Sequence, residues 1–218
     1  MSSNSRTAWN TYLAQEMIAD PLARVRMGPI RTVLDVGCGP ESIGMSRFPR
    51  GTVLVSTDVR EYPSVGVVCT ALALPFRDET FDLVLCLRVL QHLRDDGATL
   101  RELYRVTRRG GAAILAIGNR RSWTLIEGRM TNPRWRARIP YDYYHPYDAR
   151  EITRKLVDVG FEAVDVRSAL YVPEAINRLP PSMVRAVLRP AAAMDRVAGS
   201  LPGLRMAGTN LVAWGRKR

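Results

Sequence analysis

The chain has 218 residues, 46% of them apolar and 24% charged, and these values suit a globular domain with a buried core. No apolar run approaches the roughly 20 residues that span a bilayer, and the N-terminus lacks the apolar core of a signal peptide. We therefore expect no membrane-spanning segment and a cytoplasmic location. The three cysteines cannot pair completely and lack metal-ligand spacing, so we predict reduced thiols and no metal site.

The net charge of +11 is concentrated in two parts of the chain. Residues 120–138 contribute +5 and residues 167–218 contribute +7, whereas the first 119 residues are close to balance. A basic surface attracts nucleic acid, anionic membranes or acidic small molecules. Charge alone therefore leaves these three partner classes open.

The first half of the chain is organised around a turn rich in glycine. Residues 5–27 have apolar positions at helical spacing and predict a lead-in helix or two. Residues 33–36 then form an apolar run typical of a buried strand, and Gly37 and Gly39 break it, with Pro40 placed to begin a helix. Such a corner lets a ligand approach the backbone closely, and Asp35 brings a carboxylate to the same place.

A second acidic residue follows at a spacing that is informative. Residues 52–57 predict a strand that ends at Asp58, which lies 23 residues after Asp35. An acid in this place is suited to the two vicinal hydroxyls of a ribose, because a carboxylate accepts hydrogen bonds but does not donate them. A dinucleotide site would need a third glycine where this chain has Ser42. Asp35 also favours a ligand with an ammonium or sulfonium group over a pyrophosphate.

These features resemble motif I of the class I S-adenosylmethionine (SAM)-dependent methyltransferases. The turn Leu74-Pro75-Phe76, the apolar strand after Phe81-Asp82, and the sequence Leu-x-His-Leu over residues 90–93 are similar to the UbiE-like, or type-11, group of that family. So is the pattern L-x-E-x-x-R-V-x-x-x-G-G over residues 100–111. The resemblance implies an α/β fold: a Rossmann-like, doubly wound, seven-stranded sheet with an antiparallel strand 7 and helices on both faces.

The remaining elements follow this order in one domain, residues 1–218. We predict strands near 67–68, 83–87, 112–117, 161–166 and 208–214, with helices over 94–109 and 148–160. Asp148 is a predicted N-cap, and Glu151 would complete its capping box. Residues 119–147 are aromatic and too long for a plain connection, so we expect a cap over the ligand crevice, and residues 173–205 predict a second insertion.

The resemblance also implies which residues hold SAM and its product, S-adenosylhomocysteine. The methionine part would lie at Asp35, Gly37, Cys38 and Gly39, and the ribose at Asp58. The adenine would be flanked by Val59, Thr70 and Ala71, and the inner edge of the site would be lined by Leu87 and Arg88. Relatives usually carry an acid where this chain has Thr70, and a hydroxyl binds the adenine amino group more weakly than a carboxylate does.

Three side chains near this site are candidates for catalysis. The two histidines of the chain, His92 and His145, both fall beside the expected crevice, and imidazole is a suitable base near neutral pH. Tyr144 is the third candidate, as a wall of the pocket rather than as a base. The alternative for His92 is a packing or capping role, and for His145 a place in an aromatic cluster.

The sequence predicts methyl transfer to a small-molecule or lipid-like acceptor, directed to oxygen or nitrogen. Arginines of the expected cap suit an acidic group on this acceptor: Arg120, Arg121, Arg129, Arg134, Arg136 and Arg138. An RNA methyltransferase and a non-catalytic SAM-binding module stay open as alternatives, and so does contact with a membrane surface. The oligomeric state is open as well.

Overall fold

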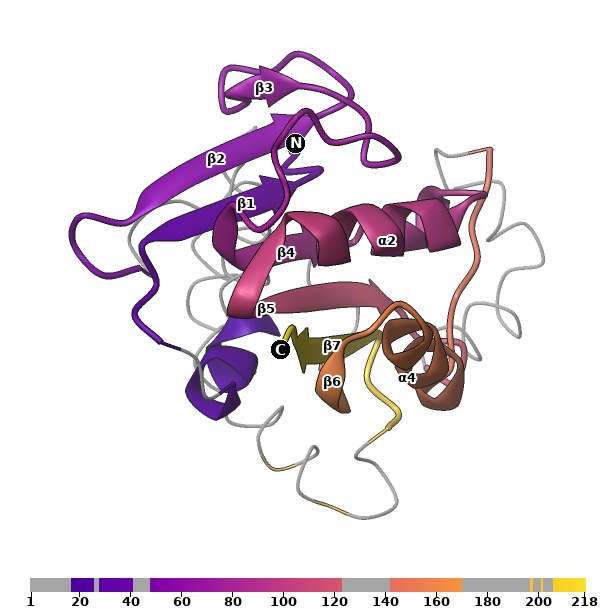
Figure 1. Ribbon diagram of the computed structural model, residues 1–218. Coiled ribbons are helices and arrows are strands. Elements are labelled where there is room, and N and C mark those ends of the chain that lie inside the picture. The colour runs from indigo at the N-terminus through magenta and orange to yellow at the C-terminus, as the bar shows by residue number, and fades with distance from the viewer. Residues whose placement is uncertain are drawn as a thin grey trace, which may run out of the picture.

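The computed structural model describes residues 17–25, 28–40, 48–122, 142–169, 197, 201 and 206–218. These residues form a seven-stranded sheet in the order β3-β2-β1-β4-β5-β7-β6 (Figure 1). The strands are β1 (Thr32–Val36), β2 (Val53–Asp58), β3 (Val67–Val68), β4 (Phe81–Leu87), β5 (Thr107–Gly118), β6 (Glu162–Ala169) and β7 (Asn210–Arg216).

The direction of the strands confirms the predicted topology. β1 to β5 pair in parallel, and β7 runs antiparallel to both of its neighbours, β5 and β6. β1 lies in the middle of the parallel part, with Asp35 opposite Ser56 of β2 on one side and Leu85 of β4 on the other. The carboxyl ends of β1, β2, β4 and β5 therefore share one edge of the sheet, where ligands bind in folds of this class.

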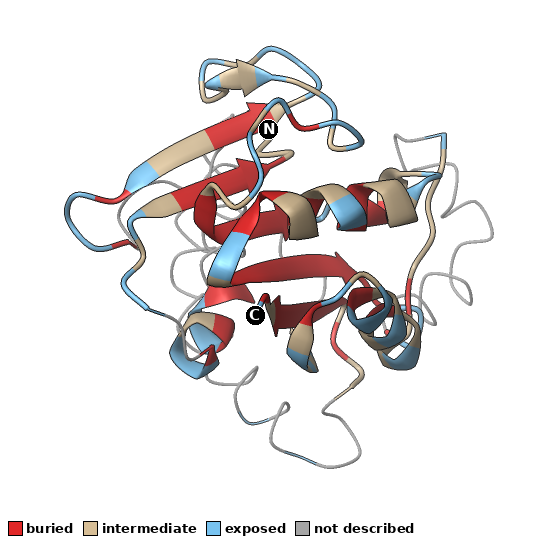
Figure 2. Cartoon of the chain, viewed as in Figure 1, coloured by how far each residue is buried: buried red, intermediate tan, exposed pale blue. Residues whose placement is uncertain are grey.

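Helices cover both faces of the sheet, and the apolar core is divided accordingly. Residues 17–24 are helical, and Met17 and Ile18 pack with Val33 and Leu85 on one face. On the other face α2 (Asp96–Val106) and α4 (Ala149–Asp158) bury apolar side chains against the alternate residues of the same strands (Figure 2). Strands buried on both faces explain the continuous apolar runs in the sequence.

One boundary was predicted wrongly. The helix expected over residues 94–109 ends at Val106, and β5 begins at Thr107, so Gly110 and Gly111 lie inside a strand rather than at a helix end. Gly110 has a φ of 77° within a shift of the β4–β5 register. Its N–H donates to the Lys217 carbonyl at 2.7 Å, and the Lys217 N–H donates to the Gly111 carbonyl at 3.0 Å. Pairing with the segment after β7 therefore extends the strand across both glycines.

The start of α4 confirms half of the predicted capping box. The Asp148 carboxylate accepts a hydrogen bond from the Glu151 N–H at 2.9 Å, as an N-cap does. The Glu151 carboxylate instead binds His145 and Arg120.

Several predictions lie outside the described residues. They are the helix expected after Pro40, residues 123–141 of the expected cap, and residues 173–205 of the second insertion except 197 and 201. None of the helices in the described ranges is both long and apolar enough to cross a bilayer. Within those ranges no group of His, Cys, Asp and Glu side chains is arranged to hold a metal ion. The cytoplasmic location stays a prediction.

Candidate active site

The glycine turn, residues 37–39, is held against the end of β2 by backbone hydrogen bonds. The N–H groups of Gly37 and Cys38 both donate to the Thr57 carbonyl, at 2.8 and 2.9 Å. Gly37 has a φ of 70°, and a Cβ atom built there would lie only 2.2 Å from Cγ2 of Val89. Both the backbone conformation and the close approach of Val89 therefore require glycine at this position.

Asp58 ties the same turn to the segment that follows β2. Its Oδ2 accepts a hydrogen bond from the Gly39 N–H at 2.9 Å, and its Oδ1 accepts one from the Arg60 N–H, also at 2.9 Å. The Ser64 hydroxyl donates to the Gly39 carbonyl at 2.7 Å. The structure thus brings Gly39 and Asp58 together, as the sequence predicted. Ser64 is an addition that no motif indicated.

The other groups at the turn are buried. Asp35 is 3% exposed, and its carbonyl accepts a hydrogen bond from the Thr57 hydroxyl at 3.3 Å. Burial, together with the negative charge of Asp35, raises the pKa of the Cys38 thiol to about 11. Cys38 therefore remains a neutral thiol near neutral pH and is unsuited to act as a nucleophile.

The side expected to hold adenine presents apolar surface next to Asp58. Val59 is 69% exposed, which is unusual for a side chain of this type beside a buried strand. The Cys69 N–H donates to the Asp58 carbonyl at 2.9 Å, so Thr70 and Ala71 follow directly beside it. The Thr70 hydroxyl accepts a hydrogen bond from the Leu72 N–H at 3.2 Å, which makes Thr70 the start of a turn.

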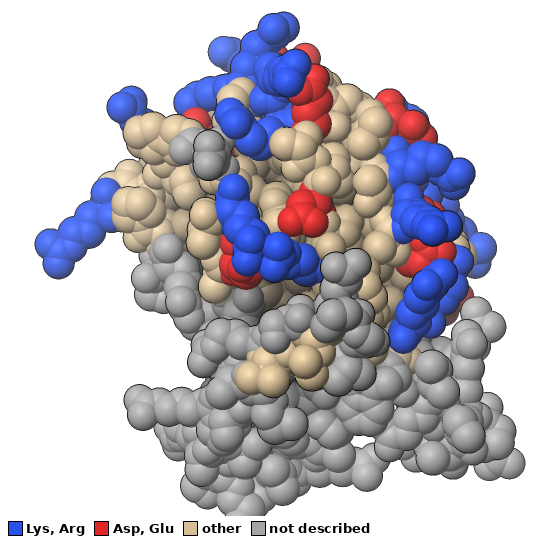
Figure 3. Space-filling model, turned by 90° about the horizontal axis from the view of Figure 1, so that it is seen from below, with Lys and Arg blue, Asp and Glu red and all other residues tan. Residues whose placement is uncertain are grey.

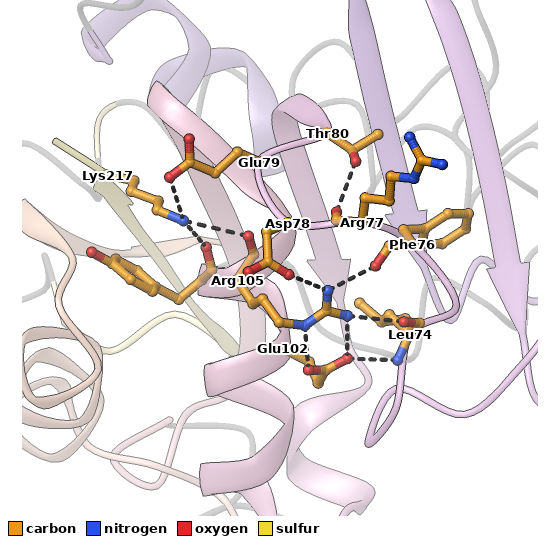
Figure 4. Close-up of polar contacts among 10 residues, drawn as sticks. Leu74, Phe76, Arg77, Asp78, Glu79, Thr80, Glu102, Arg105 and Lys217 are labelled. Atoms are coloured by element: carbon orange, nitrogen blue, oxygen red, sulfur yellow. Dashed lines mark hydrogen bonds and ion pairs between the residues drawn. The ribbon is translucent and has the colours of Figure 1, made fainter.

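An arginine of α2 holds the next part of this segment in place (Figure 4). The Arg105 guanidinium donates to the carbonyls of Leu74 and Phe76 at 2.9 and 2.7 Å. It also forms two hydrogen bonds with Glu102, at 2.7 and 2.8 Å, and Glu102 accepts one from the Leu74 N–H at 2.7 Å. Glu102 and Arg105, the acid and the base of the E-x-x-R pattern, therefore anchor the Leu-Pro-Phe turn to α2. The segment that begins at Thr70 is held at its far end by the same contacts.

The chain leaves β4 in an uncommon conformation. Leu87 is half-buried at the end of the strand, and Arg88 has a φ of 64°, in the left-handed region that non-glycine residues rarely adopt. The Arg88 N–H donates to the Ala116 carbonyl of β5 at 2.7 Å, which holds this conformation. Backbone strain of this kind is commonly found at functional sites.

His92 and Tyr144 lie together beyond the ends of β4 and β5. Their ring centroids are 5.6 Å apart, and a Cβ atom built on Gly118 would lie 2.3 Å from the Tyr144 hydroxyl oxygen. Tyr144 therefore packs directly on the last residue of β5. Burial lowers the pKa of His92 below its usual value of 6.5, and the positive charge of Arg88 lowers it further. His92 is therefore neutral near pH 7.

His145 is bound to the start of α4. Its Nε2 lies 2.8 Å from the Glu151 carboxylate and 3.3 Å from the Arg120 guanidinium. Its ring packs edge-on against Tyr147, whose hydroxyl donates to Asp96 at 2.7 Å. Of the three catalytic candidates, the structure thus pairs His92 with Tyr144 and gives His145 ionic partners of its own.

Comparison with known proteins shows which family this site resembles. Residues 34–115, from β1 into β5, match the family model described as a methyltransferase domain. The ubiquinone/menaquinone biosynthesis C-methyltransferase UbiE of Xanthomonas oryzae is 31% identical over 147 residues, which are 67% of this chain and 49% of that protein. Residues 34–115 therefore match a methyltransferase domain, and the chain is similar in sequence and fold to SAM-dependent methyltransferases. It spans about half the length of the curated relatives that it matches.

Other known proteins show the same similarity. The ubiquinone biosynthesis O-methyltransferase of Pseudomonas paraeruginosa is 30% identical over 105 residues, which are 41% of this chain and 45% of that protein. A solved 1,6-didemethyltoxoflavin-N1-methyltransferase of Burkholderia thailandensis, with its substrate and S-adenosylhomocysteine bound, superposes with a TM-score of 0.57 at 17% identity. That superposition covers 98% of this chain and 82% of the other, and it supports the shared fold.

Some of the charged residues in the described part of the chain form ion pairs, among them Arg105 with Glu102 and Arg120 with Glu151. Figure 3 shows Lys and Arg side chains interspersed with Asp and Glu over the described part of the face seen from below. Arg120, one of the arginines expected to face the acceptor, forms a 2.8 Å hydrogen bond with Glu151 and another with the Pro146 carbonyl at 3.1 Å. The expected cap arginines beyond Arg121 lie outside the described residues.

Proposed function

We propose that the chain transfers a methyl group from SAM to a small-molecule or lipid-like acceptor at the carboxyl ends of β1, β2, β4 and β5. The observation that carries this proposal is the hydrogen-bonded corner formed by Gly39 and Asp58. On the other side of the same sheet edge lie the neutral His92 and Tyr144.

The residues of this corner fit SAM. An ionised carboxylate has about four acceptor positions, and Asp58 uses two of them for backbone N–H groups, which leaves two for the ribose hydroxyls. The exposed side chain of Val59 provides an apolar surface for one face of the adenine. Asp35 brings a negative charge that suits the ammonium group of the methionine part. We expect Gly37, Cys38, Thr70, Ala71, Leu87 and Arg88 to complete the cofactor site.

When bound, SAM supplies a methyl group that its sulfonium has already activated. The tasks left to the chain are to orient the acceptor, exclude water and accept a proton where the acceptor loses one. His92 is suited to the last task, because its lowered pKa keeps a lone pair available on the neutral ring. Tyr144 would form a wall of the acceptor pocket, and its position is fixed by contact with Gly118.

The relatives support an acceptor of modest size with an apolar part. The two curated relatives are named for steps of ubiquinone and menaquinone biosynthesis, one at carbon and one at oxygen, and the Burkholderia enzyme is named for methylation at a ring nitrogen. We propose an oxygen or nitrogen acceptor for this chain, with an acidic group near the arginines of the expected cap.

A labelling experiment tests this function. The full chain is incubated with SAM carrying a 13C-labelled methyl group, together with quinol precursors, small aromatic acids, total RNA or vesicles of anionic phospholipid. We expect label in the fraction of small organic molecules, and less of it in Asp58→Ala when the SAM concentration lies below the dissociation constant of that variant. Label in RNA would overturn the acceptor class. Binding of SAM without any methyl transfer would favour a non-catalytic module.

A further inference from the structure

Gln91 is a buried amide with an incomplete set of hydrogen bonds, and it lies next to His92. Both residues belong to the short helix η2 (Leu90–His92), which follows β4. Gln91 is 3% exposed, and among the described residues its Oε1 has no hydrogen-bond partner. Its Nε2 lies 3.3 Å from Nε2 of His92. A buried amide oxygen without a hydrogen bond lowers the stability of the fold, so its presence calls for an explanation.

The partners of His92 determine which of its ring nitrogens carries the proton. The Tyr143 carbonyl, 3.4 Å from Nδ1, can only accept a hydrogen bond, so the Nδ1 atom must be the donor. In the neutral ring the lone pair is then on Nε2, where the Gln91 amide N–H donates to it. If the amide were rotated by half a turn, its oxygen would face this lone pair and the two would repel each other. Both contacts are therefore satisfied when His92 carries its proton on Nδ1 and the Gln91 amide nitrogen faces Nε2.

We propose that Gln91 is a positioning residue that holds His92 as the Nδ1–H tautomer and makes Nε2 the atom that accepts the proton from the methyl acceptor. This inference rests on the function proposed above. The Gln91 amide N–H first leaves the Nε2 lone pair, because one lone pair cannot accept from two donors. As the bond from the methyl group to the acceptor oxygen or nitrogen forms and its bond to sulfur breaks, the acceptor's proton then passes to Nε2. The sulfonium becomes a neutral thioether, and the ring becomes an imidazolium.

The Gln91 amide can serve both charge states of the ring. Rotation of the amide by half a turn would bring Oε1 to Nε2, where it can accept a hydrogen bond from the new N–H group. A leucine side chain could form a hydrogen bond with the ring in neither state, and a methionine could not donate one to the neutral ring. An acid would favour the charged state throughout the cycle.

The other histidine of the chain provides an internal contrast. Among the described residues, the groups that face His92 include the amide of Gln91, the Tyr143 carbonyl, the Tyr144 ring and the positive charge of Arg88, and Arg94 lies over the Tyr143 ring at 5.2 Å. None of these carries a carboxylate. His145, by contrast, has the Glu151 carboxylate 2.8 Å from its Nε2. The two rings should therefore differ in tautomer or in charge.

Nitrogen NMR of the full chain tests the proposal without knowledge of the acceptor. Because the sequence contains two histidines, long-range 1H–15N spectra of a histidine-labelled sample can be assigned with a single His145→Gln variant. For wild type at pH 7.5 we expect His92 to show a protonated Nδ1 and an unprotonated Nε2. A protonated Nε2 in neutral His92 would overturn the proposal, and this readout does not require any Gln91 variant to fold.

Two variants then separate positioning from packing. Gln91→Met removes the amide donor at similar size, so we expect His92 to shift toward the Nε2–H tautomer. Gln91→Glu should raise the pKa of His92 by about 1 unit or more, because a carboxylate favours the imidazolium. Glu151→Gln is the matched control and should leave the His92 signals unchanged.

An unchanged His92 tautomer in Gln91→Met, in a sample that still binds SAM, would overturn the role of Gln91. Calorimetric titration with SAM on the same samples separates this outcome from failure of the proposed function. If wild type did not bind SAM, the proposed function would fail whatever the tautomer of His92.

Discussion

The proposed cofactor side and the proposed acceptor side of this edge of the sheet are built in different ways. On the cofactor side, backbone N–H groups of the glycine turn bind Thr57 and Asp58, which are only about twenty residues further along the chain. On the acceptor side, Asn119 reaches the carbonyls of Met206 and Gly208, at 2.8 and 2.7 Å, and Tyr147 exchanges backbone hydrogen bonds with the end of β5.

The two sides therefore differ in how far a short stretch of sequence determines their structure. The cofactor side is specified by a short motif, because the required backbone conformation and the acid are encoded close together. The acceptor side depends on contacts between segments that are brought together only by the completed fold. Changes on the first side should therefore affect SAM affinity, and changes on the second should affect acceptor turnover or stability.

The largest effect should come from Gly37→Ala. Its Cβ would meet Val89 at 2.2 Å, and the residue keeps a φ of 70°, so left-handed strain of about 1–2 kcal/mol adds to an overpacking penalty of about 1–3 kcal/mol. Gly39→Ala is a matched control, because Gly39 has a φ of 64° but nothing within 4 Å of the added atom. Calorimetric titration with SAM and thermal unfolding would measure both. Equal losses in the two variants would contradict the role of the Val89 contact.

Tyr147→Phe should come next and should act on stability rather than on SAM affinity. The Tyr147 hydroxyl donates to Asp96 at 2.7 Å, and Asp96 also binds Lys155 at 2.9 Å, so Asp96 joins α2 both to the segment before α4 and to α4 itself. Loss of a hydrogen bond to a charged group costs about 1.5–3 kcal/mol of unfolding free energy. Urea unfolding would measure it, with Tyr143→Phe as the control. A destabilisation that appeared equally in the control would disprove a specific link through Asp96.

Gly118→Ala should have a smaller effect and should sharpen the comparison. The added atom would displace the Tyr144 hydroxyl, which is the far end of a side chain rather than backbone, so the backbone should change little. We expect acceptor turnover to fall about tenfold, equivalent to about 1.4 kcal/mol, with unchanged SAM affinity. Gly28→Ala, which meets nothing within 4 Å, is the control. A loss of SAM affinity in Gly118→Ala would show that the two sides are not separable.

The smallest effect concerns pH. The pKa of His92 lies below 6.5 in the folded chain because of burial and the charge of Arg88, so below pH 6.5 the unfolded chain binds more protons. The free energy of unfolding should therefore fall as the pH is lowered through 6.5 toward the folded pKa, and this contribution should be constant above that range. His92→Gln should lose this part of the pH dependence in urea unfolding at pH 7.5, 6.5 and 5.5. The same pH dependence in wild type and variant would remove His92 as its cause.

The sequence predicted the strands and the glycine corner because both depend on local patterns, whereas the antiparallel strand 7 was predicted from the family resemblance. Apolar runs bounded by glycines located the strands, and the spacing of Asp35 and Asp58 indicated the ligand edge. It failed at Gly110 and Gly111, since their place in β5 depends on pairing with Lys217, more than a hundred residues away.

Contacts on both sides of the site show the same limit of sequence reasoning. Nothing in the local pattern indicated that Ser64 would bind the glycine turn, that Gly118 makes room for Tyr144, or that Gln91 would be a buried amide. Their roles arise from neighbours that are distant in the chain or from hydrogen bonds that a motif does not record. The glycine before Asn119 was the one available signal, because glycine at the end of a buried strand often marks a close approach.

The measurement that tests the account most directly is calorimetric titration of wild type, Asp58→Asn and Asp58→Ala with SAM and with S-adenosylhomocysteine. If Asp58 holds the ribose while it orders the glycine turn, Asp58→Ala should weaken both ligands by about 1–3 kcal/mol, and Asp58→Asn should weaken them less. Wild type should not bind NAD. Unchanged SAM affinity in Asp58→Ala, or binding of NAD in preference to SAM, would contradict the assignment of the cofactor site to this corner.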